Sequence, residues 1–265
     1  MLAFARFFRY TLSGILWDRR LTSIYTAVFF DLYGTLCDIR TDETRPALWR
    51  AFAAYAALCG ADWAPGALRA RTLALCEEET HALAAASGLD EEDVEIDLMR
   101  VFARLFAEKG AAVSDERLAD TALFFRALSY RRPPRLMKGA VETLSALRRS
   151  GCGVYLLSNA QRCFTLSELR RLGLDDRFDG IFLSSDYGCK KPSPVFFRAA
   201  LEQAGRKPEE VLMVGNDMGS DVAGAHALGM PSRYLHSRIS PPRRGELPED
   251  CREIRTLTDL CAELL

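Results

Sequence analysis

Apolar and polar positions follow two different spacings along the chain, and each spacing predicts one kind of element. Mainly apolar runs of strand length occur at residues 25–30, 153–157, 180–184 and 211–214, and residues 232–235 are expected to form a last strand. Apolar residues three and four positions apart, the helical spacing, occur at residues 139–150, 163–172, 193–205, 221–228 and 257–265. Because these strands and helices alternate, the sequence predicts an α/β fold with a Rossmann-like parallel sheet and helices on both faces.

A second region, directly behind the first strand, is helical throughout. Its apolar spacing predicts helices at residues 42–60, 64–87, 91–110 and 114–130. The Arg-Arg-Pro-Pro sequence at residues 131–134 ends this pattern, because proline cannot continue a helix. We therefore expect an all-helical domain of residues 39–131, inserted into an α/β core of residues 24–38 and 132–265.

Residues 1–23 form an N-terminal extension ahead of the first strand. Helical spacing is shared by four apolar residues, namely Phe4, Phe8, Leu12 and Ile15, which predicts a short amphipathic helix. Arg6 and Arg9 interrupt the apolar stretch and no small-residue cleavage site follows, which argues against a secretory signal. The segment is also too short to span a bilayer. We favour a helix that docks on the domain, or an extension upstream of the true start, over one that contacts a membrane surface.

Composition and charge indicate which kind of ligand the protein binds and whether its cysteines are reduced. The 265 residues have a formal net charge of −1, so no overall field attracts nucleic acid or an anionic membrane, and a small-molecule substrate is expected. The eight cysteines form no C-x-x-C pair, which favours buried thiols in a reducing, cytoplasmic setting. With three histidines, none near a cysteine pair, a zinc site is not expected. The sequence leaves the oligomeric state open.

Candidate chemistry gathers at the ends of the predicted strands. Asp31 closes the first apolar run, and the tight turn at Gly34 and Thr35 leaves backbone N–H groups near its carboxylate, where an anion can bind. In a parallel sheet this carboxyl edge is where ligands bind. An aspartate that only begins a turn is an equally ordinary interpretation of Asp31 taken alone.

Three further strand ends carry polar groups that the topology places at the same edge. Ser158 and Asn159 follow the second strand, Lys191 precedes Pro192, and Asn216 and Asp217 follow the strand at residues 211–214. Each group has an ordinary explanation as a turn or a helix start. Together, a carboxylate, a hydroxyl, an ammonium and a carboxyl/amide pair predict a site for a phosphate or a carboxylate.

The sequence resembles the haloacid dehalogenase superfamily of hydrolases between residues 25 and 231. The resemblance rests on four segments in the family's order, FFDLYGTL, LLSNA, KKPSPVFF and VGNDMGSDVAGAHALGM. It implies that Asp31 is the nucleophile that forms a covalent aspartyl intermediate, and that Ser158 donates to the transferring group. It implies that Lys191 neutralises the nucleophile and the substrate anion, and that the helical domain is a mobile cap.

Two residues depart from the metal-dependent phosphatases of that family. Those enzymes carry an aspartate two residues after the nucleophile, where this chain has Tyr33, the residue found in the family's 2-haloacid dehalogenases. They also carry an acid directly after the glycine of the last motif, where this chain has Asn216. Mg²⁺ would then rely on Asp31, the Tyr33 carbonyl, Asn216, and Asp217 or Asp221.

Three functions follow from these departures. The first is a Mg²⁺-dependent phosphatase of small phosphorylated metabolites, with a good leaving group such as an acyl or enol phosphate. The second is a metal-independent 2-haloacid dehalogenase, in which Asp31 displaces halide and Asp221 helps water attack the ester. The third is a non-catalytic descendant that binds a phosphorylated ligand. The expected site comprises catalytic Asp31, Ser158, Lys191 and Asp221, with Tyr33, Gly34, Thr35 and Asn159 around the substrate.

Overall fold

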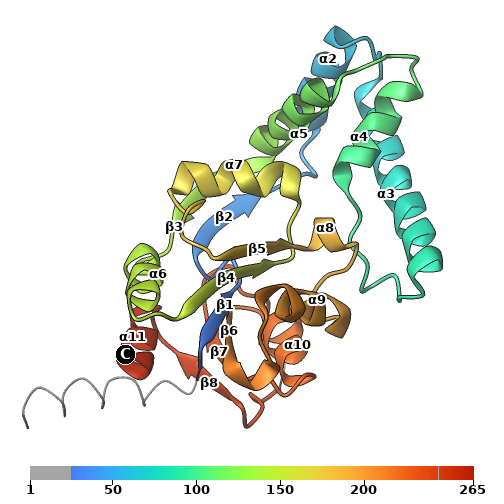
Figure 1. The fold of residues 1–265 in the computed structure, drawn as a ribbon. Helices are drawn as coiled ribbons and strands as arrows, with labels where there is room; N and C mark the ends of the chain where they lie inside the picture. The colour runs from blue at the N-terminus through green and yellow to red at the C-terminus, as the bar shows by residue number, and fades with distance from the viewer. Residues whose placement is uncertain (1–24, 244) are drawn as a thin grey trace, which may run out of the picture.

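A six-stranded parallel sheet forms the centre of the computed structural model, which describes residues 25–243 and 245–265 (Figure 1). The helix predicted within residues 1–23 lies outside the described residues. The sheet has the strand order β5-β4-β1-β6-β7-β8 and consists of β1 (Ala27–Phe30), β4 (Gly153–Ser158), β5 (Gly180–Leu183), β6 (Val211–Gly215), β7 (Ser232–Leu235) and β8 (Cys251–Ile254). All of its pairings are parallel. The Rossmann-like α/β fold is thus confirmed.

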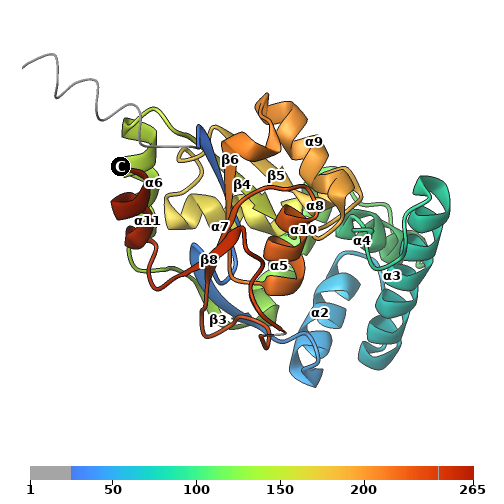
Figure 2. The same cartoon turned by 90° about the horizontal axis from the view of Figure 1, so that it is seen from below.

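Helices cover both faces of this sheet because successive strand residues point to opposite sides. Val28 and Phe30 pack under α6 (Ala140–Arg149), α7 (Arg162–Leu172) and α11 (Thr258–Leu264). Ala27 and Phe29 pack under α9 (Pro194–Ala204) and α10 (Ala223–His226) on the other face. Figure 2 shows the two groups of helices on either side of the strands.

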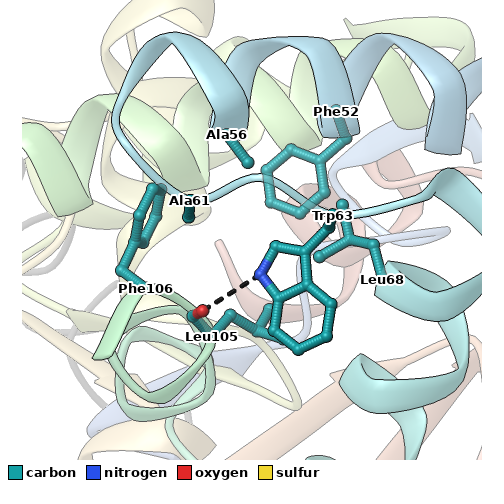
Figure 3. Close-up of a pocket in the computed structure, with 7 residues that line it drawn as sticks. All are labelled: Phe52, Ala56, Ala61, Trp63, Leu68, Leu105 and Phe106. Carbon is teal, nitrogen blue, oxygen red and sulfur yellow. Dashed lines mark hydrogen bonds between the residues drawn. The ribbon is translucent and has the colours of Figure 1, made fainter. Parts of the chain in front are cut away.

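A separate helical lobe stands beside the sheet and consists of α2 (Pro46–Leu58), α3 (Pro65–Ser87), α4 (Leu98–Ala107) and α5 (Asp115–Ser129). It has an apolar cluster of its own, to which Phe164 of α7 also belongs. In Figure 3 the Trp63 indole packs beside Phe52 and Leu68, and its N–H donates to the Leu105 carbonyl at 3.1 Å. The lobe is therefore a packed unit, and Phe164 of the core is part of its apolar cluster.

The connection between core and lobe differs from the prediction. Residues Cys37–Thr41 form β2 and residues Tyr130–Leu136 form β3, which pair as a two-stranded antiparallel sheet, and α2 begins only at Pro46. The helix predicted from residue 42 was therefore too long, and the break at residues 131–134 is a strand. In β2 buried Cys37 and Ile39 alternate with more exposed neighbours, which is the period of a strand. Strand β3 pairs on one side only, with β2, so its other edge needs no backbone N–H donors. Pro133 and Pro134 are tolerated there, because proline has no N–H to donate.

Three other boundaries also differ. The helix predicted at residues 91–110 begins at Leu98, because residues 93–97 are irregular and Val94 forms an isolated bridge with Cys189. The helix predicted at 221–228 is a π-helical turn, Met218–Val222, followed by α10. Strand β8 was not predicted, because its two central residues are exposed and charged. Short helices at Ser184–Tyr187 (α8) and Pro208–Glu210 (η1) were missed as well.

The described part of the chain contains no helix that is both long and apolar enough to cross a membrane. All eight cysteines lie in it as free thiols, buried or half-buried.

Candidate active site

Asp31 lies directly after β1, at the carboxyl edge of the sheet, with 7% of its surface exposed. Its backbone N–H donates to the Val214 carbonyl at 2.9 Å, which continues the pairing with β6 and fixes the start of the loop. The Ser158 hydroxyl, at the end of β4, donates to Asp31 Oδ1 at 3.2 Å. The sheet thus brings a carboxylate and a hydroxyl together from neighbouring strand ends, as the sequence predicts.

Lys191 is the centre of the charged site. Its Nζ donates to Asp31 Oδ1 at 2.8 Å, to Asp221 Oδ1 at 2.6 Å and to the Leu157 carbonyl at 2.8 Å. Burial opposes the charged ammonium, but the carboxylates of Asp221 and Asp31 outweigh it and raise the pKa of Lys191. One cation between two carboxylates leaves a formal charge of −1 in a buried place.

Asp221 lies behind Lys191 and is almost completely buried. Its Oδ2 accepts from the Asp217 N–H at 3.0 Å, so both carboxylate oxygens are engaged. Burial raises the pKa of Asp221, and Lys191 opposes that rise. Asp221 and Asp31 are therefore linked through Lys191, which contacts both carboxylates.

Asn159 holds the Lys191 backbone. The Asn159 Nδ2 donates to the Lys191 carbonyl and the Lys191 N–H donates to Asn159 Oδ1, each at 2.8 Å. This reciprocal pair ties the end of β4 to the segment before Pro192. The structure gives Asn159 a contact that positions the ammonium, while its predicted role in substrate binding stays a prediction.

Gly34 makes a close approach to Asn216 possible. Gly34 has φ +98°, and a Cβ added there would lie 2.2 Å from Asn216 Nδ2. Between the two loops, the Thr35 hydroxyl lies 3.4 Å from Asp31 Oδ2 and 3.3 Å from Asn216 Oδ1. The Gly-Thr turn therefore brings the loop after β1 and the loop after β6 into contact.

We expect Gly34→Ala to damage the site beyond the cost of its backbone conformation. A positive φ costs an alanine about 1–2 kcal/mol, and at Gly34 the new methyl must also displace Asn216. Gly151→Ala is the matched control, since Gly151 has φ +85° but open space around it. Urea unfolding should show a loss in both variants, and only Gly34→Ala should also lose turnover. Equal turnover in the two variants would contradict the contact with Asn216.

The Tyr33 hydroxyl is engaged away from Asp31. It donates to Glu168 and lies 3.1 Å from the Thr165 hydroxyl, both on α7. Glu168 is 2% exposed and also accepts from Arg126 Nε at 2.7 Å and from the Tyr130 hydroxyl at 2.6 Å. Burial, then the negative charge of Glu168, raises the pKa of Tyr33 well above its ordinary value.

Sequence reasoning missed this buried cluster of Tyr33, Arg126, Tyr130, Thr165 and Glu168. In the sequence, Glu168 stands in SELRR, which reads as the solvated face of a helix. Its partners Tyr33, Arg126 and Tyr130 come from the loop after β1, the helical lobe and β3, which are segments far apart in the chain. The sequence around Glu168 therefore gave no indication that this side chain is buried in a polar cluster.

A cavity of about 450 Å³ lies between the core and the helical lobe, and Tyr33 of the loop after β1 is among the residues that line it. Its apolar wall includes Ile39, Ile96, Leu98, Ala160 and Phe164, and its polar lining includes Tyr33, Asn159, Gln161 and Thr165. Three charged side chains also line it, namely Glu43, Glu95 and Arg126. A cavity of this size and mixed lining suits a small polar molecule.

The predicted metal ligands form a small donor set. Asp31 Oδ2 and Asn216 Oδ1 share the Thr35 hydroxyl through two long hydrogen bonds, so both oxygens face one place and keep lone pairs for a cation. Mg²⁺ is commonly held by one or two carboxylates together with waters and substrate phosphate, which this pair fits. Within the described ranges no group of three or more His, Cys, Asp or Glu suited to a metal occurs.

Asp217 has a local task. Its Oδ1 accepts from the Gly219 N–H at 2.8 Å and its Oδ2 accepts from the Ser220 hydroxyl at 2.7 Å, so it caps the turn that follows. These contacts do not favour Asp217 as a metal ligand. That assignment, and the Tyr33 carbonyl as a ligand, stay predictions.

A parallel α/β sheet with a buried carboxylate, ammonium and carboxylate at its strand ends defines a class of hydrolases. The model of the haloacid dehalogenase-like hydrolase family matches residues 25–229 of this chain. The chain belongs to that family, and the predicted resemblance is confirmed.

Two phosphatases are among the proteins that are similar in sequence to this chain. The chain is 34% identical to ribulose-1,5-bisphosphate 5-phosphatase of Halopiger xanaduensis over 131 residues, which cover 47% of this chain and 55% of that protein. It is 34% identical to phosphoserine phosphatase of Thermus thermophilus over 157 residues, 59% of each chain. The chain thus spans a little over half the length of these curated relatives.

Solved structures show the same fold. The 2-haloacid dehalogenase of Pseudomonas syringae pv. Tomato is 24% identical, with a TM-score of 0.60 over 91% of this chain and 98% of that one. At this identity the likeness shows the fold alone.

Proposed function

We propose that this hydrolase is a Mg²⁺-dependent phosphatase that uses Asp31 as its nucleophile on small phosphorylated metabolites. The observation that carries the proposal is the contact of Lys191 with both Asp31 and the Leu157 carbonyl of β4. An ammonium in that place neutralises a carboxylate nucleophile and an incoming phosphoryl group together. The phosphatases among the relatives support this choice.

The chain's own residues then have distinct tasks. Lys191 donates to Asp31 and orients it, so that the carboxylate attacks phosphorus and forms an aspartyl phosphate as the leaving oxygen departs. Ser158 donates a hydrogen bond at the same place and can follow the phosphoryl oxygens. The helical lobe acts as the cap, whose closure excludes water from the cavity.

Asp31 and Asn216 would hold the Mg²⁺, as their shared contact with Thr35 indicates. When bound, Mg²⁺ neutralises charge on the phosphoryl oxygens and helps to orient them. Because Asn216 contributes no charge, we infer that the substrate phosphate supplies part of the binding.

One observation favours the second candidate, a 2-haloacid dehalogenase. The Tyr33 hydroxyl is committed to Glu168, so it offers no proton to a leaving group, and a halide needs none. In that reaction Asp31 would displace halide from carbon, and the ester would be hydrolysed without a metal.

A single panel of substrates separates these functions. We expect phosphate release from p-nitrophenyl phosphate and from phosphorylated metabolites in the presence of Mg²⁺, and a fall of at least about 10²-fold with EDTA. The control is 2-chloropropionate, from which we expect no chloride. Chloride release that EDTA leaves unchanged would establish the dehalogenase, and no turnover on any substrate would favour binding without catalysis.

A further inference from the structure

The helical lobe also contacts the core through the segment between α3 and α4, residues 88–97. This segment runs antiparallel to residues 188–190 of the core, with Val94 and Cys189 as bridge partners. Two backbone hydrogen bonds flank the pair, at 3.1 and 2.8 Å, each from an N–H of one segment to a carbonyl of the other. Val94 and Cys189 are almost completely buried. The lobe is thus joined to the core directly before Lys191.

Glu95 is the side chain that fastens this segment to the core. Its Oε1 accepts from Gln161 Nε2 at 2.8 Å, and its Oε2 accepts from the Ser184 hydroxyl at 3.0 Å. The Gln161 side chain also donates to the Ile96 carbonyl at 2.8 Å and accepts from the Leu98 N–H at 3.0 Å. Because Gln161 and Ser184 belong to the core, these contacts hold the start of α4 against it.

The core partners of this carboxylate lie in the loops that form the site. Gln161 lies two residues after Asn159, whose side chain exchanges two hydrogen bonds with the Lys191 backbone. Ser184 follows β5 directly, and its hydroxyl accepts from the Ala160 N–H at 2.8 Å. The lobe therefore connects the loop after β4 to the segment that carries the ammonium.

The Lys191 backbone is held from two sides. Asn159 of the core holds it directly, and the lobe holds residue 190 just before it. Its Nζ must reach three acceptors at once, at 2.6–2.8 Å. A misplacement of about 1 Å in a catalytic group can lower a rate by about 10²-fold, so the position of this backbone matters for turnover.

We propose that Glu95 is a positioning residue for Lys191. Its carboxylate docks the helical lobe on the loop after β4 and beside residues 188–190, so the ammonium is in place only while the lobe is docked. The inference rests on the proposed phosphatase function for the reaction that is turned over. Closure of the cap and completion of the charged site then occur together, which links the exclusion of water to catalysis.

Hydrogen exchange tests this coupling without any substrate. The Lys190 N–H donates to the Asp93 carbonyl across the contact between lobe and core, and the Lys191 N–H donates to Asn159 Oδ1 within the core. We expect Glu95→Ala to speed the exchange of both amides at least about tenfold, and to leave the amides of β1 unchanged. An unchanged Lys191 amide, with or without faster exchange at Lys190, would contradict the proposal.

Glu91→Ala is the matched control for these measurements. Glu91 lies in the same segment, and its carboxylate contacts His81, which also belongs to the lobe. We expect the exchange of both amides and kcat to stay within about twofold of wild type. Glu95→Gln is the conservative variant, and its effect should be smaller than that of Glu95→Ala because the amide keeps one acceptor oxygen. Circular dichroism shows that each variant is folded.

A cross-link tests whether Glu95 acts through docking, since Glu95 also lines the cavity and could contact a substrate. Bridge partners flanked by two such hydrogen bonds have Cα atoms about 4.5 Å apart, which suits a disulfide. Oxidised glutathione should therefore join Val94→Cys to Cys189, taking the two thiol hydrogens and being reduced to two molecules of glutathione. Thiol titration and non-reducing electrophoresis measure the cross-link.

Turnover of p-nitrophenyl phosphate with Mg²⁺ is then compared in the Val94→Cys background. We expect Glu95→Ala to lower kcat by about 10–10²-fold in the reduced form, and by less than about threefold in the cross-linked form. Val94→Ser, which cannot form the disulfide, should not respond to the oxidant. An equal loss in the reduced and cross-linked forms would overturn the positioning role. If wild type hydrolyses no phosphate ester, the phosphatase function fails, while hydrogen exchange still decides the role of Glu95.

Discussion

Asp31→Asn should lose at least about 10³-fold in kcat and keep the fold, because an amide cannot form the aspartyl phosphate. The substitution keeps the shape of the side chain, and Lys191 retains Asp221 as its partner at 2.6 Å. It also removes one of two carboxylates around a single buried cation, so the charge of the site changes from −1 to zero. The free energy of unfolding of the variant should therefore equal that of wild type or exceed it slightly. Residues that are needed for function often reduce stability, so their replacement can stabilise the fold.

Turnover with Mg²⁺ and urea unfolding of the same preparation measure both effects. Asp176→Asn is the control, because the Asp176 side chain is 80% exposed and lies away from the cavity. We expect it to match wild type in both assays. Activity of Asp31→Asn near that of wild type would refute the nucleophile, and unfolding of the variant would show that Asp31 is needed for structure.

Lys191→Met should have the largest effect on stability. It leaves Asp31 and Asp221 together in a buried place without a cation, and removal of one partner from a buried ion pair costs about 3–5 kcal/mol. Turnover should be lost as well, because nothing then neutralises the nucleophile and the phosphoryl group.

The loss of stability in Lys191→Met should be larger at high pH than at low pH. Without the ammonium, which lowers it, burial and the charge of Asp31 raise the pKa of Asp221 further above its unfolded value of about 4. The folded state then binds more protons than the unfolded state, so the variant loses stability as pH rises through this range. Urea unfolding at pH 5 and pH 8 should show a smaller deficit against wild type at pH 5.

Lys190→Met is the matched control for this prediction. It removes a lysine one position away that makes no contact with Asp31 or Asp221, and should change the free energy of unfolding by less than about 1 kcal/mol. Comparable losses in the two variants would contradict the choice of Lys191. A deficit that does not change between pH 5 and pH 8 would contradict the buried pair of carboxylates.

The sequence predicted the part of the site that depends on sheet topology. Asp31, Ser158 and Lys191 come together because strands in a parallel sheet end at one edge, and the apolar runs mark those strands. The contact between Gly34 and Asn216 lies at the same edge, in the loops after the adjacent strands β1 and β6, but the sequence did not predict it.

The parts that it did not predict depend on pairings between distant segments. Glu168 is buried because Tyr33, Arg126 and Tyr130 converge on it, and none of them is near it in the chain. Glu43 reaches the cavity because β2 extends to Thr41, a strand that the helical interpretation of that region left out. A hydrophobic pattern reports the period of one element, and neither of these features belongs to one element alone.

The antiparallel pair β2 and β3 has an evolutionary consequence. Thr41 and Tyr130 are partners across it, so the chain leaves the core and re-enters it at neighbouring points. The segment between those points can lengthen, shrink or be replaced by recombination while the core segments that contain Asp31, Ser158 and Lys191 keep their places. The chemistry and the choice of substrate can therefore diverge at different rates within one gene.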